Sequence, residues 1–173
     1  MGLYVSEPFK DQVLPLSDGL AGTWETVAVM GRLAQHGAGR CDTRNLAEKI
    51  LRSSGIAARD WPAESRAMSL WVRNHIRYTR DGLTVETLKT VDRMIDDVSR
   101  HGFTMADCDD ASVFLAALLL CIGHAPAFQV LGRNETPHHV NVIDKSTGLE
   151  LDPTGEPRGA WGFREVFDVS PVR

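Results

Sequence analysis

A run of ten apolar residues, Val113 to Ile122, constrains the fold of this chain more than any other feature. A helix needs about 20 such residues to cross a bilayer, so this run is too short for that. We therefore predict a helix over residues 109–122 that is apolar almost all round and buried in the centre of the domain. Gly123 is its expected C-cap, and Pro126 follows shortly after.

Four stretches upstream of this run have the spacing of amphipathic helices. The third starts at Asp60, a candidate N-cap, and has Pro62 in its first turn. Residues 1–18 predict an irregular arm, and residues 78–87 predict a loop with some extended character. We expect the four helices to span approximately residues 23–35, 43–53, 61–76 and 88–98.

Downstream of the apolar run the pattern changes to short extended stretches. Lys145 to Gly148 is a candidate turn that joins the last two of them into a hairpin. Helices, then one buried helix, then an antiparallel sheet indicate an α+β fold. The expected strands are residues 127–131, 139–143 and 149–152.

The charge and the cysteine count narrow the class of protein. A formal net charge of −4 at pH 7 disfavours a general electrostatic grip on nucleic acid or anionic lipid, so we expect neither as a partner. The first six residues lack the basic start and apolar stretch of a signal peptide, which predicts a cytoplasmic protein. Three cysteines are an odd number and do not suggest a disulfide framework.

Cys108 stands at the expected entry to the buried helix. A thiol in the first turn of a helix lies at the positive end of the helix dipole, which lowers its pKa and favours the thiolate. Asp107, Asp109 and Asp110 surround it. They oppose the thiolate if they point at the sulfur, and support it if they cap the helix or bind other groups.

A base and its orienting carboxylate are predicted on the hairpin. His139 begins one strand and Asp152 ends the next, and in a hairpin turning near residues 145–148 they fall close to opposite one another. Neighbouring strands lie about 5 Å apart, so an Asp–His hydrogen bond is geometrically natural. Cys108, His139 and Asp152 would then form a catalytic triad with an activated nucleophile.

Two alternatives concern the same residues. Adjacent strand residues face opposite sides, so only one of His138 and His139 can point at the thiol, and the expected register favours His139. The cysteine, histidine and aspartate could instead bind zinc with His101, His138 or Asp110. Since no paired Cys-x-x-Cys or His-x-x-x-His spacing is present, we predict no metal.

The other cysteines and the tryptophans have less specific interpretations. Cys121 falls on the apolar helix and is expected in the core, while Cys41 has no evident base nearby in the sequence. Trp161 could line a cleft or anchor the C-terminal tail.

Three motifs resemble the transglutaminase-like superfamily of cysteine enzymes. The nucleophile helix of this superfamily is matched by Asp107-Cys108-Asp109-Asp110-Ala111-Ser112 and the helix after it. Its histidine-led strand is matched by His139-Val140-Asn141-Val142, and its aspartate before Pro-Thr is matched by Asp152-Pro153-Thr154. The segment from Trp71 to Tyr78 followed by Asp81 looks like the one that precedes the cysteine in bacterial and phage members. The resemblance covers roughly residues 60–155. Ala106 and Asn141 depart from the family pattern, which often has glycine and an aromatic residue there.

The resemblance implies a papain-like core and thioester chemistry on an amide. Cys108 would attack the carbonyl, His139 would move the proton, and Asp152 would fix the imidazole tautomer. The backbone N–H of Cys108 would donate a hydrogen bond to the oxyanion, and Asn74 is a guess for a second oxyanion donor. Short members like this one are similar to predicted cysteine proteases of bacteria and prophages, with a peptide or protein substrate and no cofactor. The corresponding division is a single domain over residues 1–173, with an N-terminal arm (1–18), a helical part (19–100), a catalytic core (101–155) and a C-terminal tail (156–173).

Three functions remain open at the level of sequence. A cysteine peptidase or amidase passes the acyl group to water, whereas a transglutaminase passes it to an amine. The third is a catalytically inactive structural or interaction protein, such as a component of a phage particle.

Overall fold

The computed structural model describes residues 2–5, 12–80, 85–134, 136–155 and 161–169. Within these ranges the helices are α1 (Leu20–Ala38), α2 (Cys41–Ser53), α3 (Trp61–His75), α4 (Val91–His101) and α5 (Cys108–Cys121). The strands are β1 (Gly2–Val5), β2 (Gln12–Pro15), β3 (Ile76–Tyr78), β4 (Val85–Leu88), β5 (Thr104–Ala106), β6 (Pro126–Arg133), β7 (Thr136–Asp144), β8 (Leu149–Leu151) and β9 (Phe163–Asp168).

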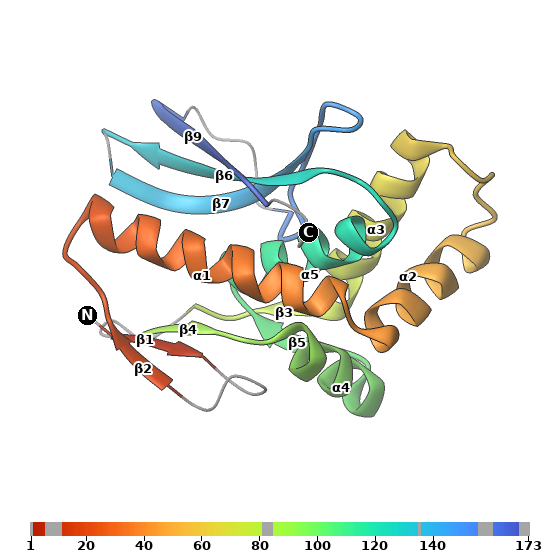
Figure 1. Cartoon of the computed structure of the whole chain (residues 1–173), viewed down its shortest axis with the longest axis horizontal. Helices are drawn as coiled ribbons and strands as arrows, with labels where there is room; N and C mark the ends of the chain where they lie inside the picture. The colour runs from red at the N-terminus through yellow and green to blue at the C-terminus, as the bar shows by residue number, and fades with distance from the viewer. Residues whose placement is uncertain (1, 6–11, 81–84, 135, 156–160, 170–173) are drawn as a thin grey trace.

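Helix α5 is the buried centre of the fold, as its apolar run predicts. It contacts α1, α2 and α3 as well as strands β6 and β7, so apolar side chains are covered on every side (Figure 1). Its N-cap is Asp107, whose Oδ1 accepts hydrogen bonds from the backbone N–H groups of Asp109 (3.0 Å) and Asp110 (3.1 Å). Gly123 follows the C-cap residue Ile122 with a φ of 94°.

The predicted antiparallel sheet is present and has four strands in the order β8-β7-β6-β9. Because side chains alternate along a strand, Val140 and Val142 lie in the core, and the intervening Asn141 faces the other side of the sheet. Val142 pairs with Phe128 on β6 and with Leu151 on β8, and both partners are also in the core. The α+β class and the small antiparallel sheet are therefore confirmed.

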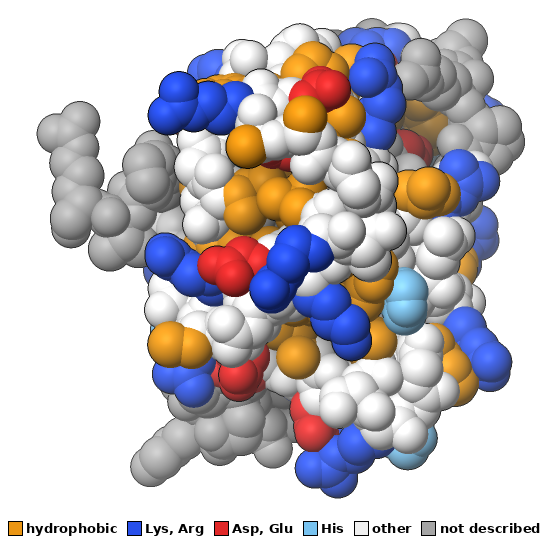
Figure 2. All heavy atoms as spheres, turned by 90° about the vertical axis from the view of Figure 1, so that its right-hand side faces the viewer, with side chains coloured by type: hydrophobic (Ala, Val, Ile, Leu, Met, Phe, Trp, Pro, Cys, Tyr) orange, Lys and Arg blue, Asp and Glu red, His pale blue; other side chains and the backbone are white. Residues whose placement is uncertain are grey.

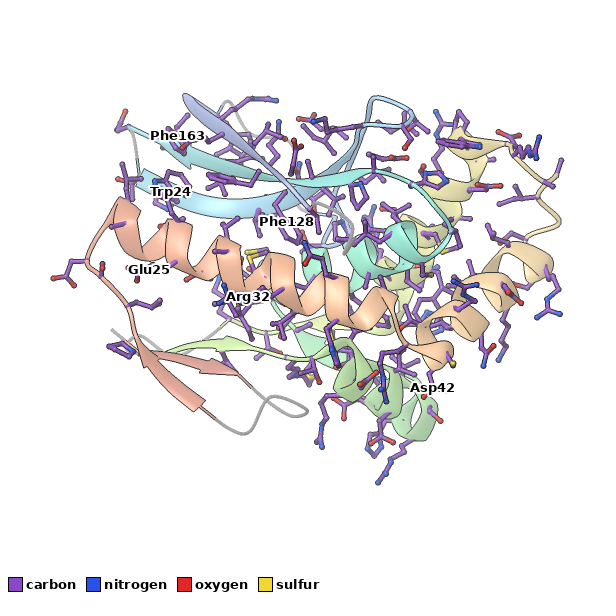
Figure 3. The ribbon with its side chains drawn as sticks, viewed as in Figure 1. Trp24, Glu25, Arg32, Asp42, Phe128 and Phe163 are labelled. Atoms are coloured by element: carbon purple, nitrogen blue, oxygen red, sulfur yellow. The ribbon has the colours of Figure 1, made fainter. Side chains whose placement is uncertain are left out.

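Strand β9 was not predicted, since residues 156–173 were expected to form a tail. It pairs with β6 along its whole length, from Ala127 with Asp168 to Gly132 with Phe163. Trp24 on α1 packs against it, with ring centroids 6.2 Å from Phe163 and 4.8 Å from Phe167 (Figure 3). This strand depends on partners far away along the chain, which local periodicity does not reveal.

Two small sheets replace parts of the predicted arm and loop. β1 pairs with β2 and, in parallel, with β4; β3 pairs in parallel with β5. These strands have three or four residues each, and most of them pair across long separations. The prediction of an irregular arm was wrong at β1 and β2, whereas β4 agrees with the extended character expected within residues 78–87. The rest of the arm (1 and 6–11) and of the loop (81–84) lies outside the described residues.

Several helix boundaries also differ from expectation, and two of the differences have a clear structural cause. Helix α4 starts at Val91 and not near residue 88, because the Thr90 hydroxyl caps it by accepting from Arg93 N–H (3.3 Å). Helix α1 continues through Gly37 to Ala38, three residues beyond its predicted end. Gly37 packs on Val91 so closely that a Cβ atom there would overlap the valine side chain.

A buried polar cluster joins helix α3 to the end of the sheet. His124 Nδ1 lies 2.7 Å from Asp144 Oδ2, and its Nε2 lies 3.0 Å from Glu64 Oε2. The Ser65 hydroxyl donates to the same Asp144 oxygen at 2.6 Å. Burial raises the pKa of Asp144, but hydrogen bonds from Ser65 and His124 outweigh it and hold that pKa below its ordinary value.

The helical side of the molecule carries mixed charge. Figure 2 shows Lys, Arg, Asp and Glu side chains around small hydrophobic patches on the side that is at the right of Figure 1. A cavity of about 410 Å³ opens between α2, α3 and α4 and shares no lining residue with the cavity beside Cys108. None of the described helices is long and apolar enough to cross a membrane.

Candidate active site

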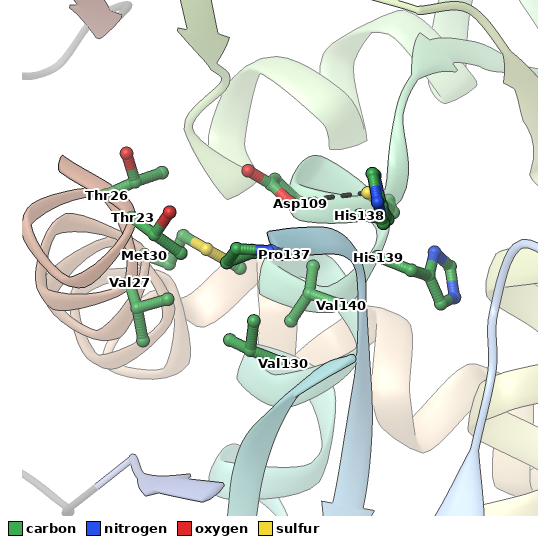
Figure 4. A pocket seen from close by; sticks show the side chains of 11 residues that line it. Thr23, Thr26, Val27, Met30, Asp109, Val130, Pro137, His138, His139 and Val140 are labelled. Atoms are coloured by element: carbon green, nitrogen blue, oxygen red, sulfur yellow. Dashed lines mark hydrogen bonds between the residues drawn. The ribbon is translucent and has the colours of Figure 1, made fainter. Parts of the chain in front are cut away.

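Cys108 is the first residue of α5 and lies at the wall of a cavity of about 210 Å³. Its thiol is half-buried. The cavity is enclosed by α1, the start of α5, and strands β6 and β7 (Figure 4). Its lining residues are Thr23, Thr26, Val27, Met30, Cys108, Asp109, Val130, Pro137, His138, His139 and Val140.

Helix α1 contributes the wall that sequence reasoning missed. Thr23, Thr26, Val27 and Met30 follow one another at the i, i+3, i+4, i+7 spacing of a single helix face. The spacing is visible in the sequence, but it is also that of an ordinary core-facing stripe. Only the packing of α1 beside the start of α5 makes it part of a site.

The three aspartates next to Cys108 point in different directions. Asp107 caps the helix, and Asp110 Oδ1 accepts a hydrogen bond from the backbone N–H of Lys89 (2.7 Å). Asp109 turns to the sulfur, and its Oδ1 accepts the thiol hydrogen of Cys108 at 3.4 Å. Of the three, Asp109 alone is among the residues that line the cavity.

The burial of Cys108 and its contact with Asp109 disfavour the thiolate form. Burial, the negative charge of Asp109 and that of Asp107 raise the pKa of the Cys108 thiol well above its ordinary value. The helix dipole was expected to lower that pKa, but the net shift is upward, because burial and the carboxylates outweigh the lowering by a backbone hydrogen bond of Val140. In this conformation the thiol is therefore protonated at neutral pH.

His139 and Asp152 are hydrogen-bonded, as the hairpin argument predicts. His139 Nε2 lies 2.8 Å from Asp152 Oδ2. The strand register differs by two residues from the predicted one: Val142 pairs with Leu151, which places Asp152 beside Asn141 and diagonal to His139. A shift of two leaves both side chains on one face of the sheet, and so preserves their contact.

The Asp152-Pro153-Thr154 segment holds this carboxylate ionised. Asp152 Oδ1 accepts hydrogen bonds from the backbone N–H (3.0 Å) and the hydroxyl (2.7 Å) of Thr154. Burial raises the pKa of Asp152, but the hydrogen bonds from His139 and Thr154 outweigh it and lower that pKa below the ordinary value.

The Asp152 contact determines which imidazole nitrogen can act as a base. A carboxylate only accepts hydrogen bonds, so Nε2 of His139 carries the proton in the neutral ring and Nδ1 carries the lone pair. Within the described residues Nδ1 has no hydrogen-bond partner. It is the atom that could receive a proton from a thiol.

His139 and Cys108 line the same cavity, but no hydrogen bond joins them in the described part of the chain. Figure 4 shows the His139 ring on the other side of β7 from Val140. His138 is exposed and lines the cavity as well. The structure thus brings His139 and Asp152 together, and leaves the Cys108 thiol with Asp109.

The far side of His139 is covered by Trp161. Its ring stacks on the imidazole with centroids 6.1 Å apart and planes inclined by 15°. Both residues line a second cavity, of about 30 Å³, together with Asp152 and Asn141. Of the two roles expected for Trp161, the structure supports the cleft-lining one.

Two buried amide oxygens lie on the same face of the sheet. Asn141 Oδ1 and Gln129 Oε1 belong to directly paired residues, and neither has a hydrogen-bond partner within the described residues. Asn141 is one of the two positions, with Ala106, at which the sequence differs from the pattern of the superfamily that it resembles. Its carbonyl gives this face an acceptor that an aromatic side chain would lack.

The remaining candidates lie outside this cavity. Cys121 donates to the Leu118 carbonyl (3.1 Å), and burial raises the pKa of its thiol to about 11. Cys41 is exposed. Asn74, the guessed oxyanion donor, is exposed on α3 and lines neither cavity that His139 borders. Among the described residues no group of three or more His, Cys, Asp or Glu side chains could hold a metal ion.

Comparisons of this chain with protein-family models, with curated proteins and with solved structures give no match.

Proposed function

We propose that this protein is a cysteine peptidase or amidase of the transglutaminase-like type, with a papain-like core. The observation that carries the proposal is the His139–Asp152 hydrogen bond of 2.8 Å, on a histidine that lines the same cavity as Cys108. An Asp–His pair close to a cysteine at a helix start is the kind of arrangement that cysteine hydrolases use.

The proposed reaction starts when the Cys108 side chain turns from Asp109 to His139. Nδ1 takes the thiol proton, and the sulfur attacks the carbonyl carbon of the substrate amide. The C–N bond breaks as His139 returns the proton to the leaving amine. Water then attacks the thioester and gives a proton to His139. The C–S bond breaks, the acid is released, and the departing thiolate takes that proton from His139 to regenerate the thiol. Asp152 stabilises the imidazolium in both halves.

One oxyanion donor is available at the nucleophile itself. The backbone N–H of Cys108 has no hydrogen-bond partner in the described residues, since Asp107 Oδ1 is shared by the next two N–H groups. An N–H at this end of a helix is aimed outward and needs no reorganisation to bind a developing negative charge.

A binding protein without catalysis is the second candidate. The Cys108–Asp109 hydrogen bond and the raised pKa of the thiol favour it, because a thiol held protonated and away from its base is a poor nucleophile.

Hydrolysis of a library of fluorogenic peptide amides decides between the two. The wild type is expected to release the fluorophore, with mass spectrometry showing a free acid as the second product. Cys108→Ala is expected to fold normally and to lose the activity. Activity that survives in Cys108→Ala, or a wild type inert to the whole library, overturns the hydrolase proposal.

A further inference from the structure

The cavity beside the nucleophile contains one carboxylate among mostly apolar and hydroxyl side chains. Asp109 lies at its centre in the view of Figure 4, between the threonines of α1 and the histidines of β7. The floor is apolar and includes Met30, Val130 and Val140. The Thr26 hydroxyl donates to the Gly22 carbonyl (3.1 Å), which leaves its oxygen able to accept.

The position of this carboxylate relative to the sulfur matters for substrate choice. Asp109 Oδ1 is 3.4 Å from Cys108 Sγ, and a thiolate there would face a negative charge at contact distance. A cation bound to Asp109 removes that repulsion. The same cation then favours the reactive form of the nucleophile when the substrate binds.

The short distance also restricts where the cation can be. A carbonyl carbon poised for attack lies about 3–3.5 Å from the sulfur. The α-nitrogen of an amino acid is two bonds from its carbonyl carbon, or about 2.5 Å. With the sulfur still in its position beside Asp109, before it turns to His139, an α-ammonium can therefore reach Asp109 while its own carbonyl carbon lies at attack distance from the sulfur.

We propose that the cavity accepts the amino-terminal residue of its substrate, and that Asp109 binds the free α-ammonium group. This inference rests on the proposed function for the nature of the reacting bond. Asp109 is then the residue that determines specificity for aminoacyl amides over N-blocked ones. The floor of Met30, Val130 and Val140 favours a small apolar side chain on that residue.

Two histidines in the same cavity could reverse its preference for a cation. His138 and His139 also line it, and a protonated imidazole there would favour an anion instead. Whether the cavity prefers to bind a cation or an anion can be measured, and that preference does not depend on whether the thiol reacts.

The test is an NMR titration of the full chain carrying Cys108→Ala with L-alaninamide and, separately, with N-acetyl-L-alaninamide. Amide shifts of residues 108–110 and 138–140 report binding. L-Alaninamide is expected to bind roughly tenfold or more tightly than the acetylated compound, and Asp109→Asn is expected to bring the two to within about twofold. Asp42→Asn, an exposed first-turn aspartate of α2, is the matched control and should keep the preference.

Equal binding of the two amides, tighter binding of the acetylated one, or no shift with either at a ligand concentration about a hundred times that of the protein overturns the inference. Hydrolysis is tested separately with L-alanine 4-nitroanilide. If the NMR preference is present but the anilide stays intact, the cation site stands and the proposed hydrolase function fails. If N-acetylated peptide amides are cleaved as fast as free ones, the hydrolase stands and the specificity inference fails.

Discussion

At the scale of the residue, chemical type alone does not fix function. Asp107, Asp109 and Asp110 are identical side chains within four positions, yet one caps a helix, one binds a backbone N–H and one contacts the sulfur. The first role stabilises the start of α5, and the second joins α5 to the connection between β4 and α4. The third works against the thiolate, so the same residue type both builds the site and restrains it.

Alkylation of the thiol tests this restraint. In the wild type, iodoacetamide at pH 8 is expected to label Cys108 more slowly than the exposed Cys41, because the raised pKa leaves little thiolate. Asp109→Asn removes a negative charge beside the sulfur, which lowers the pKa and should speed Cys108 labelling by roughly tenfold. Peptide mapping by mass spectrometry reports each cysteine. An unchanged rate in Asp109→Asn would show that the carboxylate does not control the thiol.

The proposed orienting role of Asp152 predicts a specific pH dependence. Asp152→Asn is expected to lower kcat on any substrate by roughly 10²-fold or more, since the amide can stabilise neither the reactive tautomer nor the imidazolium. The pH–rate profile should shift as well, because the carboxylate no longer supports protonation of His139. Asp168→Asn, an exposed carboxylate on β9, is the control. A profile identical to that of the wild type would count against the role.

At the scale of the element, α1 shows how packing rather than propensity sets a helix boundary. Gly37→Ala is expected to destabilise the protein by about 1–3 kcal/mol, because the new methyl group overlaps Val91 and forces α1 and α4 apart. Gly31 lies in the same helix, and a methyl group added there would meet no atom within 4 Å. Gly31→Ala should therefore stabilise by about 0.5–1 kcal/mol. Urea unfolding of both variants measures the difference, and equal effects would contradict the packing argument.

Elements with a strong local pattern could be predicted from the sequence, and those without one could not. The run from Val113 to Ile122 needs only its own residues to indicate a buried helix. β9 and the β1–β4 pair depend on partners far along the chain. In the site, His139 and Asp152 are 13 positions apart and one turn joins their strands, so their contact was predictable. The α1 wall and the direction of Asp109 are tertiary properties, and no local pattern contains them.

At the scale of the whole molecule, the His124 cluster connects the two halves of the fold. Glu64 and Ser65 belong to α3, whereas Asp144 ends β7, and a buried ring lies between them. Trp61 covers it, with ring centroids 4.9 Å apart. A buried charged network costs most when a single partner is removed, because the others lose their compensation.

Acid stability provides the test of this cluster. The pKa of Asp144 is lower in the folded state than the ordinary value of 3.8, so its contribution to stability is present above that value and is lost as the pH falls through the folded pKa. The pKa of Asp152 is also lowered in the folded state, so its contribution to stability is likewise lost as the pH falls. Asp144→Asn should cost about 3 kcal/mol at pH 7 and make the decline toward pH 3 shallower.

Urea midpoints at pH 7, 5 and 3.5 measure this dependence. Asp18→Asn, an exposed aspartate, should follow the wild-type curve. A steep acid decline that persists in Asp144→Asn would assign the effect to other carboxylates.

The order of the site residues along the chain has a consequence for biosynthesis. The α1 wall comes first, Cys108 follows, and His139 and Asp152 come last. A nascent chain leaves the ribosome amino terminus first, so the thiol emerges before its base and carboxylate do. Under the proposed mechanism, the polypeptide is thus inert toward neighbouring nascent chains through most of its own translation.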